Sequence, residues 1–86
     1  MINIAQMGIG YWGPNLLRNL VSIESCEVKT VVDLSEERRN YVKSLYPSVE
    51  VNDDLESILK DNSIDAVVIA TPVATHFDLA IRCLEA

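Results

Sequence analysis

The sequence predicts an α/β fold, in which helices pack on both faces of a parallel sheet. Two observations support this prediction. Strand-like and helix-like segments alternate along the 86 residues, which is typical of βαβ units. In addition, the three glycines of the chain, Gly8, Gly10 and Gly13, all lie in one loop between the first strand-like and the first helix-like segment.

The first half of the chain contains two predicted strand–helix pairs. Residues 2–7 are mostly apolar and lead into the glycines, and residues 27–33, "EVKTVVD", are rich in β-branched residues, so both are predicted strands. The first helix is indicated by apolar residues at helical spacing on the side of Gly13: Trp12, Leu16, Leu17 and Leu20. The second runs from a cap at Ser35 to about Tyr46, with acidic residues in its first turn and Pro47 after it.

The second half predicts two further strands and two helices. Residues 49–51 would form at most a short edge strand, and Asp53 with Glu56 has the spacing of a capping box for a short helix. Residues 64–70, "IDAVVIA", are nearly all apolar, as in a strand covered on both faces. The last helix would bury a stripe of four side chains at helical spacing: Phe77, Ala80, Ile81 and Leu84.

Right-handed crossovers between these strands predict the order 3-2-1-4. This is the first half of a doubly wound, Rossmann-type nucleotide-binding sheet plus one further strand. Two later strands are missing, and the chain stops at "CLEA" without a glycine cap for its last helix. We therefore expect residues 1–86 to be a partial, truncated dinucleotide-binding domain.

The composition, 49% hydrophobic and 23% charged residues, is that of a soluble globular protein. A formal net charge of −6 argues against a nucleic-acid partner or an anionic membrane surface, although backbone groups could still hold an anionic cofactor. Cys26 and Cys83 are not spaced with His76 as zinc ligands, so we expect no metal site and two buried free thiols. With no signal peptide or membrane-spanning run, the expected compartment is the cytoplasm.

The glycines spell G-x-G-x-x-G, a phosphate-binding signature, and each has a separate role. Gly8 would let the chain turn off the strand, Gly10 would leave room for a pyrophosphate, and Gly13 would let the helix approach the sheet. Backbone N–H groups of the first helical turn would then donate to the phosphates, favoured by the helix dipole. The alternative is a glycine-rich turn that binds no ligand.

Asp33 follows the second predicted strand, 20 residues after Gly13, where an acidic residue binds the ribose hydroxyls of the adenosine half. A carboxylate there favours NAD and would repel the extra phosphate of NADP. Arg38 and Arg39 come soon after and would soften this preference if they faced the site. The alternatives are a turn aspartate and two solvated arginines.

A second candidate segment is "ATPVATH", residues 70–76, at the same carboxyl edge of the sheet. Thr71 offers a hydroxyl, Pro72 fixes a turn, and the imidazole of His76 would donate or accept a hydrogen bond. The alternative for His76 is a solvent-facing side chain.

With both loops in place, the sequence resembles the Gfo/Idh/MocA oxidoreductase family. The resemblance lies in "GIGYWGPNLLRN", in Asp33 and in "VVIATPVATHFDLAIRCLEA", and within the family "GYWGPN" is most similar to the branch that acts on sugar nucleotides. It implies an NAD(P)-dependent dehydrogenase that moves a hydride between a sugar or cyclitol carbon and the nicotinamide. The resemblance also implies the roles of site residues. Thr71, Pro72 and His76 would line the nicotinamide-ribose side. The pyrophosphate would bind to the backbone of four residues: Ile9, Gly10, Tyr11 and Trp12.

The family's catalytic lysine belongs to a later segment, "GKHVxxEKP", which these residues do not include. We therefore expect no catalytic residue in this chain, an inactive isolated domain, and a sugar-type substrate only together with the missing domain. The rival hypothesis is a non-catalytic nucleotide-binding module, such as a CoA-binding or redox-sensing domain. A third is self-association, because residues 64–70 would form an open sheet edge, and we expect a homo-oligomer.

Overall fold

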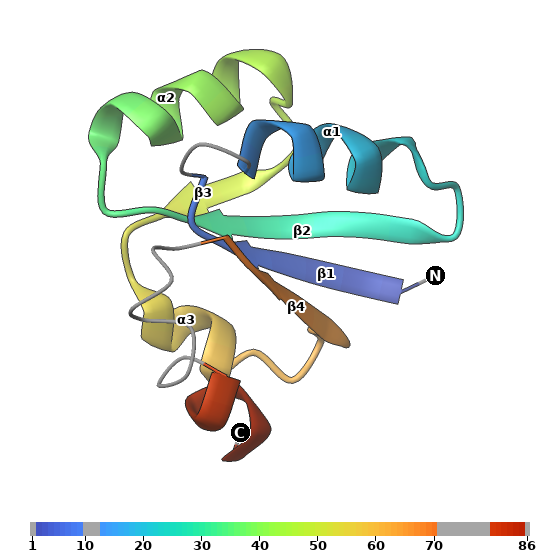
Figure 1. The fold of residues 1–86 in the computed structure, drawn as a ribbon, viewed down its shortest axis with the longest axis vertical. Helices are drawn as coiled ribbons and strands as arrows, with labels where there is room; N and C mark the ends of the chain where they lie inside the picture. The colour runs from blue at the N-terminus through green and yellow to red at the C-terminus, as the bar shows by residue number, and fades with distance from the viewer. Residues whose placement is uncertain (1, 10–12, 71–79, 86) are drawn as a thin grey trace.

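The computed structural model describes residues 2–9, 13–70 and 80–85. These residues form one parallel sheet with the strand order β3-β2-β1-β4, so the predicted order 3-2-1-4 is confirmed (Figure 1). The strands are β1 (Ile2–Met7), β2 (Cys26–Val32), β3 (Glu50–Asn52) and β4 (Ala66–Ile69). The helices are α1 (Gly13–Ser22), α2 (Glu36–Leu45) and α3 (Leu55–Leu59), and residues 80–85 are also helical.

Helices cover both faces of the sheet, with α1 and α2 on one face and α3 with the C-terminal helix on the other (Figure 1). The first face buries Leu17 of α1 and Val42 of α2 against Val31 of β2. The second buries Met7 of β1 against Ile58 of α3. The fold is therefore doubly wound and Rossmann-like, as predicted from the alternation of strands and helices.

The carboxyl ends of the four strands are level with one another. Met7 pairs with Val32 on one side and with Ile69 on the other, and Val32 pairs with Asn52. The pairing extends one residue further, because the amide of Gly8 donates to the Val32 carbonyl at 2.7 Å and the amide of Ala70 to the Met7 carbonyl at 2.7 Å. The carboxyl ends of β1, β2 and β4 consequently lie side by side.

Two helices begin at capping residues. Ser35 caps α2, as predicted, and its side chain accepts from the Arg38 amide at 3.3 Å. The cap of α3 is Asp54, which accepts from the Glu56 amide at 3.0 Å, so the prediction of Asp53 was wrong by one residue. The reason is that the Asn52 side chain accepts from the Asp54 amide and forms a turn between β3 and the helix.

Burial is lower than predicted in α1, β4 and the last helix. Leu16 is exposed, because the buried side of α1 centres on Gly13 and Leu17. β4 is an edge strand of the described sheet, so its residues are half-buried or exposed instead of covered on both faces. Each of these differences concerns a side of an element that no described segment covers.

The predicted stripe of the last helix is wrong at two positions, since Ile81 is exposed and Leu84 is 83% exposed. Phe77 lies outside the described residues. The side nearest the sheet contains Ala80 and Cys83, which are half-buried, and the Cys83 thiol lies 3.9 Å from the Met7 sulfur. Desolvation raises the pKa of this thiol. Both cysteines are free, as predicted, but they are half-buried, so the prediction that they are buried was wrong.

Within the described segments, no helix is both long enough and apolar enough to cross a membrane.

Candidate functional site

The glycine loop begins with a turn that only glycine adopts easily. Gly8 follows β1 with a φ of 87°, in the left-handed region. A side chain in that conformation would cost about 1–2 kcal/mol. The role predicted for Gly8, turning the chain off the strand, is therefore the role it has.

The loop ends at Gly13, the first residue of α1, and the packing there leaves no room for a side chain. A Cβ at this position would lie 3.2 Å from Nε2 of Gln6 and 3.3 Å from the Gly8 carbonyl oxygen. Gly13 thus permits the close approach of helix and strand that the sequence predicted. Pro14 follows in the first helical turn, where a missing N–H removes no helical hydrogen bond.

Gln6, a buried polar residue of β1, was not predicted as a site residue. Its Nε2 donates to the Gly8 carbonyl at 3.0 Å and to the Gly13 carbonyl at 3.2 Å. One signal for it was present in the sequence: a long polar side chain in an apolar strand, two residues before the first glycine.

Asp33 lies directly after β2 and is only 8% exposed. Its Oδ2 accepts from the Ile9 amide at 2.8 Å, and its Oδ1 accepts from the Ser35 amide at 2.8 Å. The carboxylate therefore joins the glycine loop to the start of α2. A carboxylate has about four acceptor positions, so each oxygen can accept one further donor, such as a ribose hydroxyl.

Ile9 has a different environment from the one expected for a phosphate-binding residue. Its side chain is buried in the core beneath α1 and α2, and its N–H already has an acceptor in Asp33. A phosphate at this amide would have to share it with the carboxylate or replace that partner.

The two arginines after β2 differ from each other. Arg38 is exposed, whereas Arg39 is half-buried and donates from Nη1 to the Asp33 carbonyl at 2.8 Å. A guanidinium therefore lies beside the end of β2, close to the predicted ribose site.

The structure thus brings together Gly8, Ile9, Gly13 and Asp33, which lie up to 25 positions apart in the sequence. The remaining predicted site residues lie outside the described residues: Gly10, Tyr11, Trp12, Thr71, Pro72 and His76. The segment containing the last three begins after Ala70, whose amide is bonded to Met7 immediately before the glycine turn.

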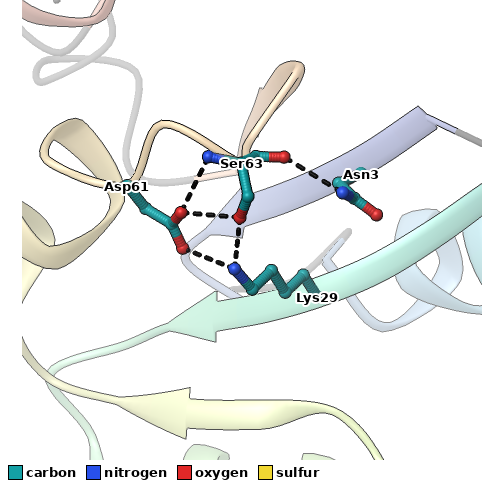
Figure 2. A network of polar contacts seen from close by, with 4 residues as sticks. All are labelled: Asn3, Lys29, Asp61 and Ser63. Atoms are coloured by element: carbon teal, nitrogen blue, oxygen red, sulfur yellow. Dashed lines mark hydrogen bonds and ion pairs between the residues drawn. The ribbon is translucent and has the colours of Figure 1, made fainter.

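A separate polar network, centred on Asp61, ties the segment before β4 to β1 and β2 (Figure 2). Lys29 donates to Asp61 Oδ2 at 2.8 Å and also to the Ser63 hydroxyl, and Asn3 Nδ2 donates to the Ser63 carbonyl at 3.1 Å. The hydrogen bond from Lys29, followed by those from Ser63, lowers the pKa of Asp61 to about 2. Asn3 lies at the amino end of β1, away from the glycine turn, so this network is structural.

Taken together, the sheet order, the glycine turn after β1, the helix that begins at its end and the acid after β2 are the features of a dinucleotide-binding Rossmann domain. Gly13 has no side chain, so α1 can pack closely on β1, and this type of cofactor site requires that close packing. The chain belongs to the Gfo/Idh/MocA oxidoreductase family, whose NAD-binding Rossmann-fold profile matches residues 2–86.

Two curated relatives illustrate the range of this similarity. The chain is 29% identical over 85 residues to 4-carboxy-2-hydroxymuconate-6-semialdehyde dehydrogenase of Sphingobium sp., covering 99% of this chain and 27% of that protein. It is 32% identical over 85 residues to the NAD⁺-dependent scyllo-inositol 2-dehydrogenase of Bacillus subtilis, covering 98% of this chain and 25% of the relative. The chain therefore spans about a quarter of the length of these relatives.

Solved structures agree with this assignment. An NAD-binding protein from Listeria innocua superposes with a TM-score of 0.87 at 30% identity, over 98% of this chain and 24% of that chain. A scyllo-inositol dehydrogenase from Lactobacillus casei, solved with NAD(H) and scyllo-inositol, has a TM-score of 0.87 over 99% of this chain and 25% of its own. At 23% identity, the latter supports the fold.

Proposed function

We propose that this chain holds NAD for a dehydrogenase that moves a hydride between the nicotinamide and a hydroxyl-bearing carbon of a sugar-type substrate. The observation that carries the proposal is the contact between Asp33 Oδ2 and the Ile9 amide at 2.8 Å. It sets the acidic residue against the glycine loop, which is the arrangement that a ribose joined to a pyrophosphate requires.

In this proposal the chain's own residues bind and orient the cofactor. The pyrophosphate lies against the backbone of residues 9–12 and the N-terminus of α1, and Asp33 accepts hydrogen bonds from the adenosine ribose. Thr71, Pro72 and His76 line the nicotinamide-ribose side. Bound NAD supplies the hydride acceptor, and none of these site residues is assigned a proton-transfer role.

The preference for NAD over NADP follows from the surroundings of Asp33. Its two oxygens are fixed by backbone amides at 2.8 Å, so the carboxylate cannot swing away from an added phosphate. Two unit charges about 5 Å apart repel by roughly 3 kcal/mol at an effective dielectric constant of 20. The neighbouring guanidinium of Arg39 offsets part of this repulsion.

The substrate belongs to the rest of the protein, since this chain spans about a quarter of relatives such as the scyllo-inositol 2-dehydrogenase. A sugar-type or cyclitol substrate is supported by the inositol dehydrogenases among the relatives, and a sugar nucleotide remains the more specific prediction. Hydride transfer requires the substrate carbon to be held at about 3–3.5 Å, which we assign to a second domain. On this view residues 1–86 alone bind NAD without turnover, and the parent protein is a homo-oligomer in the cytoplasm.

Titration calorimetry on the full-length protein tests the binding claim directly. We expect NAD to bind at least about tenfold more tightly than NADP, which corresponds to 1.4 kcal/mol. Coenzyme A is the matched control, because it also carries adenosine and a pyrophosphate but belongs to the rival, non-catalytic hypothesis. Binding of coenzyme A with no heat from millimolar NAD would contradict the proposed function.

A further inference from the structure

Gln6 is a polar side chain in a position where an apolar one is expected. It is 0% exposed, and the neighbouring buried residues of β1 are Ile4, Ala5 and Met7. Burying an amide without hydrogen-bond partners is unfavourable, so a glutamine at this position needs specific partners. Among the residues that the structure describes, it finds them in the backbone at the two ends of the glycine loop.

The partners of Gln6 are two carbonyl groups, at Gly8 before the loop and at Gly13 after it, at 3.0 and 3.2 Å from Nε2. Because both partners accept, the NH₂ end of the amide must face them, and the orientation of the side chain follows from chemistry. A Cβ at Gly13 would lie 3.2 Å from the same Nε2 atom. The third glycine of the motif therefore also makes room for the Gln6 amide.

The amide oxygen of Gln6, Oε1, indicates that a glutamine at this position is not the most stabilising choice. Within the part of the chain that the structure describes, the buried Oε1 atom has no hydrogen-bond partner. A buried acceptor without a partner is destabilising, so an apolar side chain of similar length would remove the cost of Oε1 but would leave the two loop carbonyls without this donor. What an apolar residue could not do is join the Gly8 and Gly13 carbonyls.

We propose that Gln6 is a positioning residue that holds the two ends of the glycine loop at the separation a pyrophosphate requires. The proposal rests on the proposed function, since it assigns to Gln6 the preorganisation of the NAD site. Asp33 provides the third attachment through Ile9, so the loop is held at Gly8, Ile9 and Gly13 by side chains from β1 and from the end of β2.

The test compares Gln6→Met with the wild type in the full-length protein. Methionine keeps the length and flexibility of glutamine and removes the NH₂ donor. NAD, ADP-ribose and ADP contain a pyrophosphate, whereas AMP does not. Loss of two hydrogen bonds to the loop predicts about tenfold weaker binding of the first three. AMP affinity stays within about twofold. The urea midpoint of unfolding changes little, because removal of the unpartnered Oε1 offsets the loss of the donor to the two carbonyls.

Ile58→Ala is the matched control, because Ile58 is buried in α3 on the opposite face of the sheet, in a core cluster that contains no residue of the glycine loop. It lowers the unfolding midpoint and leaves all four ligand affinities unchanged. Wild-type affinity of Gln6→Met for NAD and ADP would overturn the proposal. Equal weakening of ADP and AMP together with a lower unfolding midpoint would also overturn it, since that is the signature of general destabilisation.

Amide hydrogen exchange without any nucleotide separates this proposal from the proposed function. Faster exchange of the Ile9 amide in Gln6→Met, with no change in Ile58→Ala, supports the positioning role even if neither NAD nor ADP binds the wild type. Absence of nucleotide binding would contradict the proposed function alone. Unchanged exchange at Ile9 contradicts the positioning role whatever the nucleotides do.

Discussion

Replacing Asp33 by asparagine tests how the acid after β2 connects stability to cofactor choice. The side chain is nearly isosteric, but its charge is lost and only one oxygen remains. In the wild type, two oxygens serve two amides, Ile9 and Ser35, each at 2.8 Å. In Asp33→Asn one of these amides faces an NH₂ group instead of an acceptor.

The expected magnitude follows from this geometry. A buried N–H left without an acceptor costs about 1–3 kcal/mol, and the remaining bond to the substituted side chain is weaker because its acceptor is no longer charged. We expect the free energy of unfolding to fall by about 2–4 kcal/mol, a large fraction of the roughly 5–15 kcal/mol typical of a domain. Loss of the carboxylate also removes the repulsion of a 2′-phosphate, so the ratio of NAD to NADP affinity falls at least about tenfold.

The assay is urea unfolding together with calorimetric titration of NAD and NADP on the full-length protein. The matched control is Asp53→Asn, which removes the same charge from an exposed residue after the neighbouring strand β3. It leaves the stability within about 0.5 kcal/mol and the cofactor ratio unchanged. Wild-type stability and an unchanged cofactor ratio in Asp33→Asn would refute the reasoning, because the two bonds would then contribute nothing measurable.

Three further changes have definite expected outcomes. Gly8→Ala forces a Cβ into a φ of 87° and lowers the free energy of unfolding by about 1–2 kcal/mol in urea melts; an unchanged midpoint would mean that the turn relaxes at no cost. In Gly13→Ala the new Cβ would lie 3.2 Å from Nε2 of Gln6 and displace that amide, so calorimetry shows weaker NAD binding; undiminished affinity would contradict this. Folding lowers the pKa of Asp61 from 3.8 to about 2, so the charged carboxylate stabilises the folded state. This contribution to stability is fully present above the unfolded-state pKa of Asp61 and is lost as the pH falls toward 2. Urea melts between pH 6 and 2 should therefore show wild type and Asp61→Asn converging below about pH 4, whereas a constant difference would exclude this linkage.

Local patterns predicted the elements well because their causes are local. The cap at Ser35 needs only the amide three residues further on, and the glycine turn needs only a residue that adopts a positive φ. The error at Asp53 arose from a side chain outside the motif, since Asn52 forms a turn that shifts the cap to Asp54.

Burial was predicted less well, because it depends on which elements lie opposite each face. The apolar stretch that contains β4 suggested cover on both sides, and the i, i+4 spacing in the last helix suggested a buried Ile81. Both lie where no described segment covers them. The pattern of a helix or strand indicates that it has an apolar side, whereas only the packing shows whether that side is occupied.

By itself, the sequence of this protein determined the alternation of strands and helices, the parallel order 3-2-1-4 and the glycine loop ahead of an acid. Residue periodicity determines the elements, chain connectivity determines the strand order, and glycine's missing side chain determines the turn. Each of these causes acts over a few positions of the chain. Only the tertiary structure decided that Gln6 joins the two ends of that loop and that Asp33 reaches the amide of Ile9, 24 positions away. The Gln6 contacts require α1 to pack closely on β1, and the Asp33 contact requires the ends of β1 and β2 to lie level in one sheet. Neither arrangement can be predicted from a local sequence pattern.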